Sequence, residues 1–299
     1  MTFIRCARSL VAVAACTSAV FAAARPMRSA QTTRSHVYVT IVDEKGQPVT
    51  GLGVADFAVQ MNGARQEILD VRPAATPLSI VMLTDQLGLH SNYTPVESRQ
   101  SMAAFVKTIR DGNDGAKFAL TTIDGPVRPL TSFDTAPALL DRAISRLVGV
   151  GTDSAYLDAV VHASRAMLSA PTDRRVIFSL FGAYRPDQSS ERSDATGEYL
   201  GRAQASLWAV EVIGDLLQGG NYASMPREVM LANGTRVSGG ARMPITSRQT
   251  LVPAVTRMAS LILAQYDISF GPGVRSDGST ITVGVARQNV QVLGPKWDR

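Results

Sequence analysis

A segment near the start of the chain shows the alternating pattern of a β-strand. From His36 to Asp43, apolar residues recur at every second position, which predicts a half-buried strand. Two further strands are expected at 56–61 and 66–69. The Asn62-Gly63 pair between them suits a tight hairpin turn, because both of its central residues need positive φ angles. Residues 36–72 are therefore expected to form the first part of a small β module.

From Pro77 onward, short apolar runs alternate with longer segments in which apolar residues have helical spacing. Strands that alternate with helices in this way predict a parallel sheet with helices on both faces. We expect a doubly wound α/β domain over residues 76–264. Its expected strands are 78–83, 117–123, 175–180 and 207–213, and its expected helices are 97–109, 135–148, 154–169, 194–205 and 247–264.

Residues 214–246 interrupt this rhythm. The segment is rich in Gly, Asn and Met and has no clear period, so it is expected to be a long loop. The chain then ends as it began, with apolar runs of strand length between residues 265 and 293. We predict that these strands complete the β module that residues 36–72 begin.

The net charge of +5 belongs to the N-terminal arm. The first 35 residues hold five arginines and no acidic residue, and their removal leaves 25 basic against 25 acidic residues. The remainder of the chain is therefore formally neutral, which gives no support for a nucleic-acid partner. Apolar residues make up 45% of the chain and charged residues 18%, which is a globular composition and not a disordered or fibrous one.

The N-terminal arm has the pattern of an export signal. Arg5 and Arg8 precede an uncharged run that ends at Ala24, with Ala22 and Ala24 at the spacing of a cleavage site. The run is shorter than the roughly 20 residues that a membrane span needs. We expect a signal peptide at 1–24, a flexible tether at 25–35, no membrane span after signal removal, and a periplasmic or extracellular protein.

Cys16 offers an alternative. Val13-Ala14-Ala15-Cys16 resembles a bacterial lipobox, in which Cys16 would carry a lipid anchor, and an uncleaved signal anchor is a third possibility. Because the only other cysteine is Cys6, the body of the protein has no disulfide and no thiol chemistry under any of these readings.

Several segments follow one another in an order that resembles von Willebrand factor A domains. LSIVMLTD at 78–85 resembles the family's first strand, VGT at 150–152 with YLDAV at 156–160 resembles its second metal-site loop, and RRVIFSLFG at 174–182 resembles the strand that normally ends in Asp-Gly. The flanking segments resemble, more specifically, a group of exported bacterial VWFA-related proteins. These segments are VTGL at 49–52, DF at 56–57, NG at 62–63, SGGA at 238–241 and QYDI at 265–268. The resemblance spans residues 36–293.

The resemblance also implies a metal site, and this sequence departs from it. In the family, an Asp, two serines, a Thr and a second Asp hold a divalent cation, usually magnesium, which leaves a position for a partner's carboxylate. The corresponding residues here are Asp85, Leu87, Leu89, Thr152 and Phe181. Leucine and phenylalanine cannot coordinate magnesium. We therefore expect a degenerate site without a cofactor, with weak magnesium binding through Asp85 and Thr152 as the alternative.

The three apolar replacements have two interpretations. If Leu87, Leu89 and Phe181 lie exposed at the edge of the sheet, they would form a surface for a protein partner. Alternatively, they pack beneath the 214–246 segment.

The two retained residues also have structural interpretations. Asp85 would then cap the segment after its strand, and Thr152 would cap the next helix, a task for which Asp153 and Ser154 compete.

Signatures of enzymes are absent from the sequence. It has no G-x-S-x-G elbow, H-E-x-x-H pair, phosphate-binding glycine loop or dinucleotide fingerprint. The sequence therefore favours a non-catalytic protein–protein interaction or adhesion module of the bacterial cell envelope, which binds an unidentified protein without a metal. Magnesium-dependent adhesion, an enzyme of unrecognised type and a scaffold in an envelope assembly are the alternatives.

Overall fold

The computed structural model describes residues 35–85, 95–149, 153–183, 185–213, 224–271 and 280–295. Contacts divide the chain into two units, Met1–Thr32 and Thr33–Arg299, and every described residue belongs to the second. The expected signal peptide, the lipobox cysteine and all but the last residue of the expected tether lie outside the described residues. That last residue, Ser35, begins the first strand.

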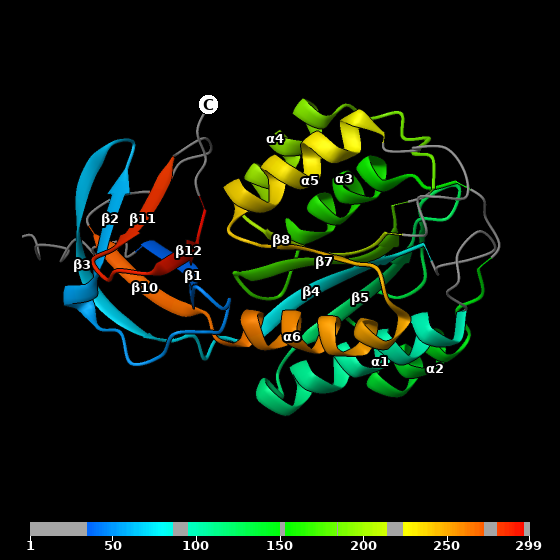
Figure 1. Ribbon diagram of the computed structural model, residues 1–299, viewed down its shortest axis with the longest axis horizontal. Helices are drawn as coiled ribbons and strands as arrows, with labels where there is room; N and C mark the ends of the chain where they lie inside the picture. Colours follow the sequence, from blue (N-terminus) through cyan, green and yellow to red (C-terminus); the bar gives the residue numbers. More distant parts are fainter. Residues whose placement is uncertain are drawn as a thin grey trace, which may run out of the picture. The chain divides into compact units, whose positions relative to one another are not determined.

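The larger sheet is doubly wound and mainly parallel, as the sequence predicts (Figure 1). Its strand order is β6-β5-β4-β7-β8-β9, in which only β6 runs antiparallel to its neighbour. The chain winds outward in one direction from β4 and in the other from β7, so the topological switch point lies between these two strands. The strands are β4 (Leu78–Thr84), β5 (Lys117–Thr122), β6 (Arg128–Pro129), β7 (Arg174–Gly182), β8 (Ser206–Val212) and β9 (Arg242–Ile245).

Helices cover both faces of this sheet. Figure 1 shows α1, α2 and α6 on one face and α3, α4 and α5 on the other. Each face has its own apolar core, because the strand residues alternate between the two helix layers. The helices are α1 (Pro95–Gly112), α2 (Pro137–Ser145), α3 (Tyr156–Met167), α4 (Ser193–Ala203), α5 (Met225–Ser238) and α6 (Leu251–Leu263). In the described part of the chain, no helix is both long enough and apolar enough to cross a membrane.

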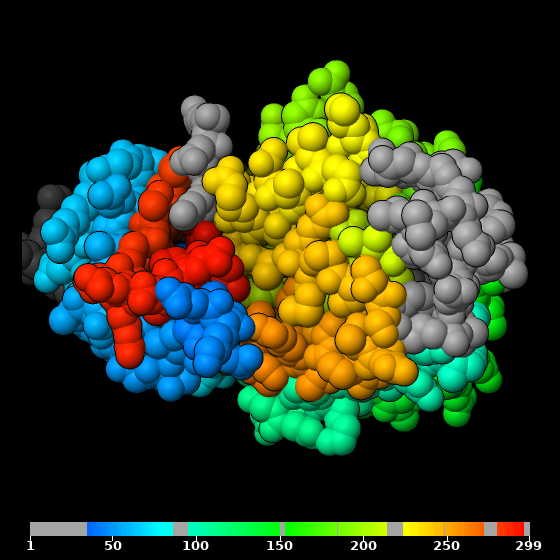
Figure 2. All heavy atoms as spheres, viewed as in Figure 1, coloured from blue at the N-terminus to red at the C-terminus, as the bar shows by residue number. Residues whose placement is uncertain are grey.

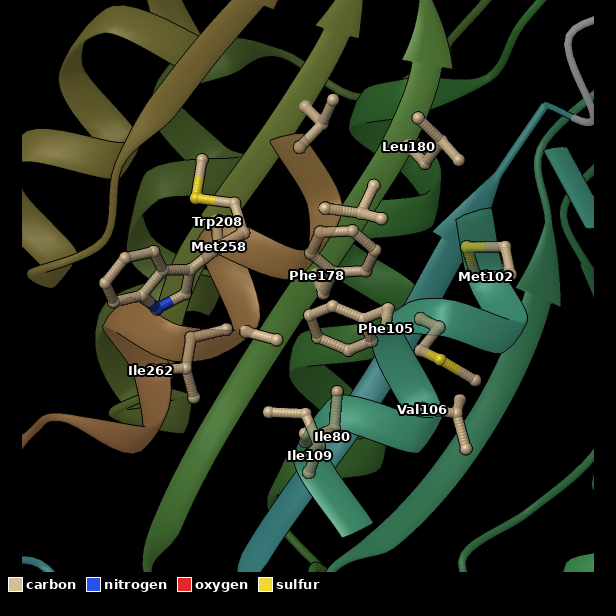
Figure 3. Packing of buried hydrophobic residues seen from close by; sticks show 14 of the residues in the cluster. Ile80, Met102, Phe105, Val106, Ile109, Phe178, Leu180, Trp208, Met258 and Ile262 are labelled. Atoms are coloured by element: carbon tan, nitrogen blue, oxygen red, sulfur yellow. The ribbon is translucent and has the colours of Figure 1, made fainter. Parts of the chain in front are cut away.

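Aromatic residues fill the core beneath α1 and α6 (Figure 3). The rings of Phe105 and Phe178 stack with centroids 3.8 Å apart. Trp208 is fully buried, and its indole Nε1 donates a hydrogen bond to Ser206 Oγ at 2.9 Å, so its polar atom is satisfied inside the core.

The second sheet is the β module, and the prediction that both ends of the chain build it is confirmed. Its six strands pair antiparallel in the order β11-β2-β3-β10-β1-β12, so that β1 lies between two strands from the far end of the chain. The predicted hairpin turn is also present, with φ angles of 52° at Asn62 and 77° at Gly63. The strands are β1 (Ser35–Asp43), β2 (Phe57–Met61), β3 (Ala64–Pro73), β10 (Tyr266–Gly271), β11 (Ile281–Val285) and β12 (Val290–Leu293).

Polar side chains join the β module to the α/β domain. The buried guanidinium of Arg174, at the start of β7, donates hydrogen bonds to Gln265 Oε1 at 2.9 Å and to the carbonyl oxygens of Ala74 and Ile262 at 2.9 and 2.7 Å. On the face shown in Figure 2, the blue turn after β1 lies against orange α6, where Arg257 Nη2 donates to the carbonyl oxygen of Lys45 at 2.8 Å. Gln265, the first residue of the QYDI segment, therefore takes part in this junction.

The expectation of a long loop at 214–246 is wrong for the part that the structure describes. This part contains the helix α5 and the edge strand β9. The apolar periodicity of a helix is missing because α5 buries small and polar side chains. Its buried residues are Arg227, Met230, Leu231, Gly234, Thr235 and Ser238.

The helix α2 also starts later than the sequence indicates. It begins at Pro137, whereas the sequence predicts a start at residue 135. Proline is suited to the first helical position, since its fixed φ angle is already helical and its missing N–H would have no partner there.

Candidate functional site

Asp85 lies at the switch point, directly after β4. Its side chain is fully buried, and its Oδ2 accepts a hydrogen bond from the backbone N–H of Gly182 at 2.7 Å. The carboxylate therefore ties the end of β4 to the end of β7. In open α/β sheets, ligands bind at this carboxyl edge.

A buried arginine accompanies this carboxylate. Arg185 Nε lies 3.5 Å from Asp85 Oδ2, and the two side chains are 1% and 0% exposed. Arg185 Nη1 also donates to the carbonyl oxygen of Asp153 at 3.4 Å. The guanidinium thus lies between Asp85 and the residue that follows Thr152, the other retained ligand position.

A second buried arginine, Arg227 of α5, holds the same turn from the other side. Its Nη1 and Nη2 donate to the carbonyl oxygens of Arg185 and Ala183 at 2.8 and 2.7 Å. The guanidinium carbon lies 5.7 Å from the centroid of the Phe181 ring, within the range of a cation–π contact. Arg227 and Asp85 together fix the backbone that follows β7.

The expectation that Phe181 contributes to an exposed partner-binding surface is wrong. Its side chain is fully buried, with its ring centroid 4.7 Å from that of Tyr156. Residue 181 points toward the core that α3 and α5 cover, where it joins Met230 and Leu231. Phe181 therefore packs beneath the 214–246 segment, which was the alternative interpretation. Leu87, Leu89 and Thr152 lie outside the described residues.

The N-terminus of α3 is capped from a distant loop. Asp187 Oδ1 accepts from the N–H of Tyr156 at 3.1 Å, and Ser189 Oγ accepts from the N–H of Leu157 at 2.9 Å. The buried hydroxyl of Ser154 has no hydrogen-bond partner among the described residues, so it is not the cap. The sequence next to α3 could not predict its cap, because the capping groups come from about 30 residues downstream.

Three buried polar atoms at this edge have no hydrogen-bond partner within the described ranges. They are Ser154 Oγ, Arg185 Nη2 and Asp187 Oδ2, and the same holds for Arg227 Nε and for Glu211 Oε1 close by. Since buried polar atoms are normally satisfied by protein or by ordered water, these atoms indicate where water or a ligand oxygen would bind.

The sequence analysis missed a buried carboxylate near the same end of the sheet. Glu211, on β8, is 1% exposed and pairs with Arg242, whose Nε donates to Glu211 Oε2 at 2.7 Å. Burial raises the pKa of Glu211 above its usual range, although the hydrogen bond from Arg242 acts in the opposite direction. The available signal was a single acidic residue inside an otherwise apolar strand.

The residues that the structure describes around Asp85 do not suit a magnesium ion. In the described part of the chain, no three His, Cys, Asp or Glu side chains converge as metal ligands. The carboxylate of Asp85 already faces the positive charge of Arg185, which would repel a divalent cation at the same place. The position of the second aspartate holds a phenylalanine.

Exposed apolar side chains surround this edge. The helices α1, α5 and α6 each follow a parallel strand and therefore start at the carboxyl edge (Figure 1). Their first turns hold Val96, Met225 and Val252, which are 46%, 77% and 38% exposed. Val148, in the connection that leads to α3, is 54% exposed. We call these four residues the apolar rim.

Comparisons with known proteins find structural likeness only. No family model matches the chain, and no curated protein matches it. The SpRpn10 VWA domain is 12% identical with a TM-score of 0.47, covering 67% of this chain and 99% of that one. The von Willebrand factor type A structure from Catenulispora acidiphila is 12% identical with a TM-score of 0.45, covering 86% and 72%.

A third similar structure is proximal thread matrix protein 1 from the mussel byssus, with a zinc-occupied MIDAS motif. It is 16% identical with a TM-score of 0.49, and the match covers 66% of this chain and 48% of that one. The fold class of the present chain rests on its own strand order and helix placement.

Proposed function

We propose that this protein is a non-catalytic interaction module of the bacterial cell envelope, which binds a protein partner at the carboxyl edge of its α/β sheet without a divalent cation. The observation that carries the proposal is the buried pair of Asp85 and Arg185, where the resemblance implies a metal. The N-terminal pattern supports export, either by cleavage near Ala24 or with a lipid anchor at Cys16.

The apolar rim supports this edge as the place of contact. Val96, Val148, Met225 and Val252 come from separate parts of the chain, yet the fold brings all four to one edge of the sheet. A protein that bound at this edge would remove these apolar side chains from water, which favours association there.

The acidic groups near the edge support a role without catalysis. Asp85 is paired with Arg185, Asp187 caps α3, and Glu211 is paired with Arg242. Each has a structural partner, whereas a general acid or base needs a proton that substrate can reach.

Capture from the native cell envelope tests the proposal. The wild-type protein and the variants Met225→Glu and Val252→Glu would be immobilised and exposed to solubilised envelope, with and without EDTA. Leu168→Glu is the matched control, because Leu168 is equally apolar and exposed but follows α3 at the opposite edge of the sheet.

We expect the wild type and the control to retain the same partner in EDTA, and the two rim variants to lose it. Retention by all variants would contradict the location of the contact, and loss of the partner in EDTA would contradict its independence of metal.

A further inference from the structure

We propose that Arg185 takes the place of the divalent cation, so that its guanidinium is the fixed positive charge that faces Asp85 and holds the backbone at Asp153. The guanidinium lies between the carboxylate of Asp85, at 3.5 Å, and the carbonyl oxygen of Asp153, at 3.4 Å. It therefore connects Asp85, which corresponds to the first Asp of the metal site in the family that the sequence resembles, with the residue that follows Thr152.

The charge at this edge supports the assignment. A fully buried carboxylate is costly unless an opposite charge and hydrogen bonds compensate it. The described residues give Asp85 the N–H of Gly182 and the guanidinium of Arg185. A guanidinium suits this role because it is planar, delocalised and more weakly hydrated than an ammonium group.

The replacement of the second aspartate fits the same picture. Here residue 181 is a phenylalanine, so this position adds no second negative charge beside Asp85. Its ring instead packs beside Arg227, which holds the carbonyl oxygen of Arg185. Phe181, Arg227 and Arg185 therefore act as one connected set.

This inference deepens the proposed function, rests on it for the place of the site and shares with it the buried pair of Asp85 and Arg185. It is tested by unfolding of the isolated full chain, whereas the proposed function is tested by capture of a partner. Failure of the pair and failure to bind a partner at this edge are therefore distinguishable.

A double-mutant cycle measured by thermal unfolding tests the pair. Asp85→Asn and Arg185→Met each remove one charge and leave the other buried, so each is expected to lower the unfolding midpoint by roughly 10 °C. The double variant removes both charges, and its loss should be clearly smaller than the sum of the two single losses. Additive losses would overturn the proposal. Arg192→Met with Asp194→Asn, an exposed pair, is the control that should show little coupling.

Replacement of the lost cation gives a readout that a merely structural arginine would not change. In Arg185→Ala, sub-denaturing guanidinium chloride should raise the midpoint relative to NaCl at equal ionic strength. The variant that carries both Asp85→Asn and Arg185→Ala should show no such rise. Equal responses in the two variants would overturn the proposal, as would stabilisation of the wild type by MgCl₂ that Asp85→Asn abolishes.

Arg185→Lys covers the case in which the neutral variants do not fold. It keeps the positive charge, so it should retain a higher midpoint than Arg185→Met or yield folded protein where Arg185→Met does not. A lysine variant no more stable than the methionine variant would overturn the assignment.

Discussion

Glu211 illustrates how one residue can depart from its surroundings. It is the acidic member of SLWAVEV, a strand that is buried along its whole length. Arg242 is its ionic partner and is shared with Glu228, and burial together with the negative charge of Glu228 raises the pKa of Glu211. The native state therefore binds a proton at Glu211 more readily than the unfolded chain does.

This raised pKa predicts a pH dependence with a definite sign. The contribution of Glu211 to stability is fully present below the unfolded pKa of about 4.3 and falls as pH rises through the folded pKa. Glu211→Gln removes this titration. The free energy of unfolding of the wild type, measured relative to Glu211→Gln by urea denaturation, should therefore decrease between pH 4 and pH 7. A difference that increases over this range would contradict the assignment.

At the same scale, the sequence could indicate Asp85 but not its partner. The position of Asp85 can be predicted because it directly follows a buried apolar run. If that run is a parallel strand, the residue after it lies at the carboxyl edge of the sheet. Arg185 follows Asp85 by 100 positions, and a basic residue in a turn gives no sign that it is buried. The burial of Phe181 could not be predicted for a related reason. The alternation of side chains along a strand does not show which of its two faces a helix from a distant part of the sequence covers.

Among the elements, the sequence predicted the segments with a clear apolar pattern, but it did not predict α5. The strands β4, β7 and β8 are buried along their length, and such uninterrupted apolar runs are typical of parallel sheets. The helix α5 packs through a buried arginine, a glycine and hydroxyl side chains, which carry no apolar period. The C-terminal end of α5 has a clearer signal in the sequence, because glycine commonly follows the last turn of a helix. Gly239 has a φ angle of 85°, and Ser238 Oγ accepts from the N–H of Leu207 at 2.9 Å.

Between α5 and β9, the chain passes so close to β8 that we expect Gly240 not to tolerate any substitution. A Cβ at Gly240 would lie 1.7 Å from the carbonyl oxygen of Leu207, which is backbone and cannot move aside. Gly240→Ala should therefore prevent the chain from packing beside β8 and abolish cooperative thermal unfolding. The control is Gly197→Ala inside α4, where the added Cβ meets nothing within 4 Å and should stabilise the protein by about 1 kcal/mol. A stable, cooperatively folded Gly240→Ala variant would refute the close approach.

For the whole molecule, Arg174 is the central link between the β module and the α/β domain. Burial lowers its pKa to about 10, so the guanidinium remains charged at neutral pH. It donates hydrogen bonds to Ala74 just after β3, to Ile262 in the last turn of α6 and to Gln265 just before β10. The RR and QYDI segments, which carry part of the family resemblance, meet in this contact.

Arg174→Met should therefore lower the free energy of unfolding by about 3–5 kcal/mol, because several buried acceptors lose their donor together. Arg192→Met, at an exposed arginine, should change stability by no more than about 0.5 kcal/mol. Chemical denaturation measures both. Equal effects of the two substitutions would show that the link through Arg174 is dispensable.

Calorimetric titration of the full chain with MgCl₂, alongside Asp85→Ala, tests the central claim most directly. A protein in which Arg185 neutralises Asp85 should give only the heat of dilution at millimolar magnesium, and Asp85→Ala should give the same trace. A saturable binding heat in the wild type that disappears in Asp85→Ala would contradict the account and restore a magnesium site at the carboxyl edge.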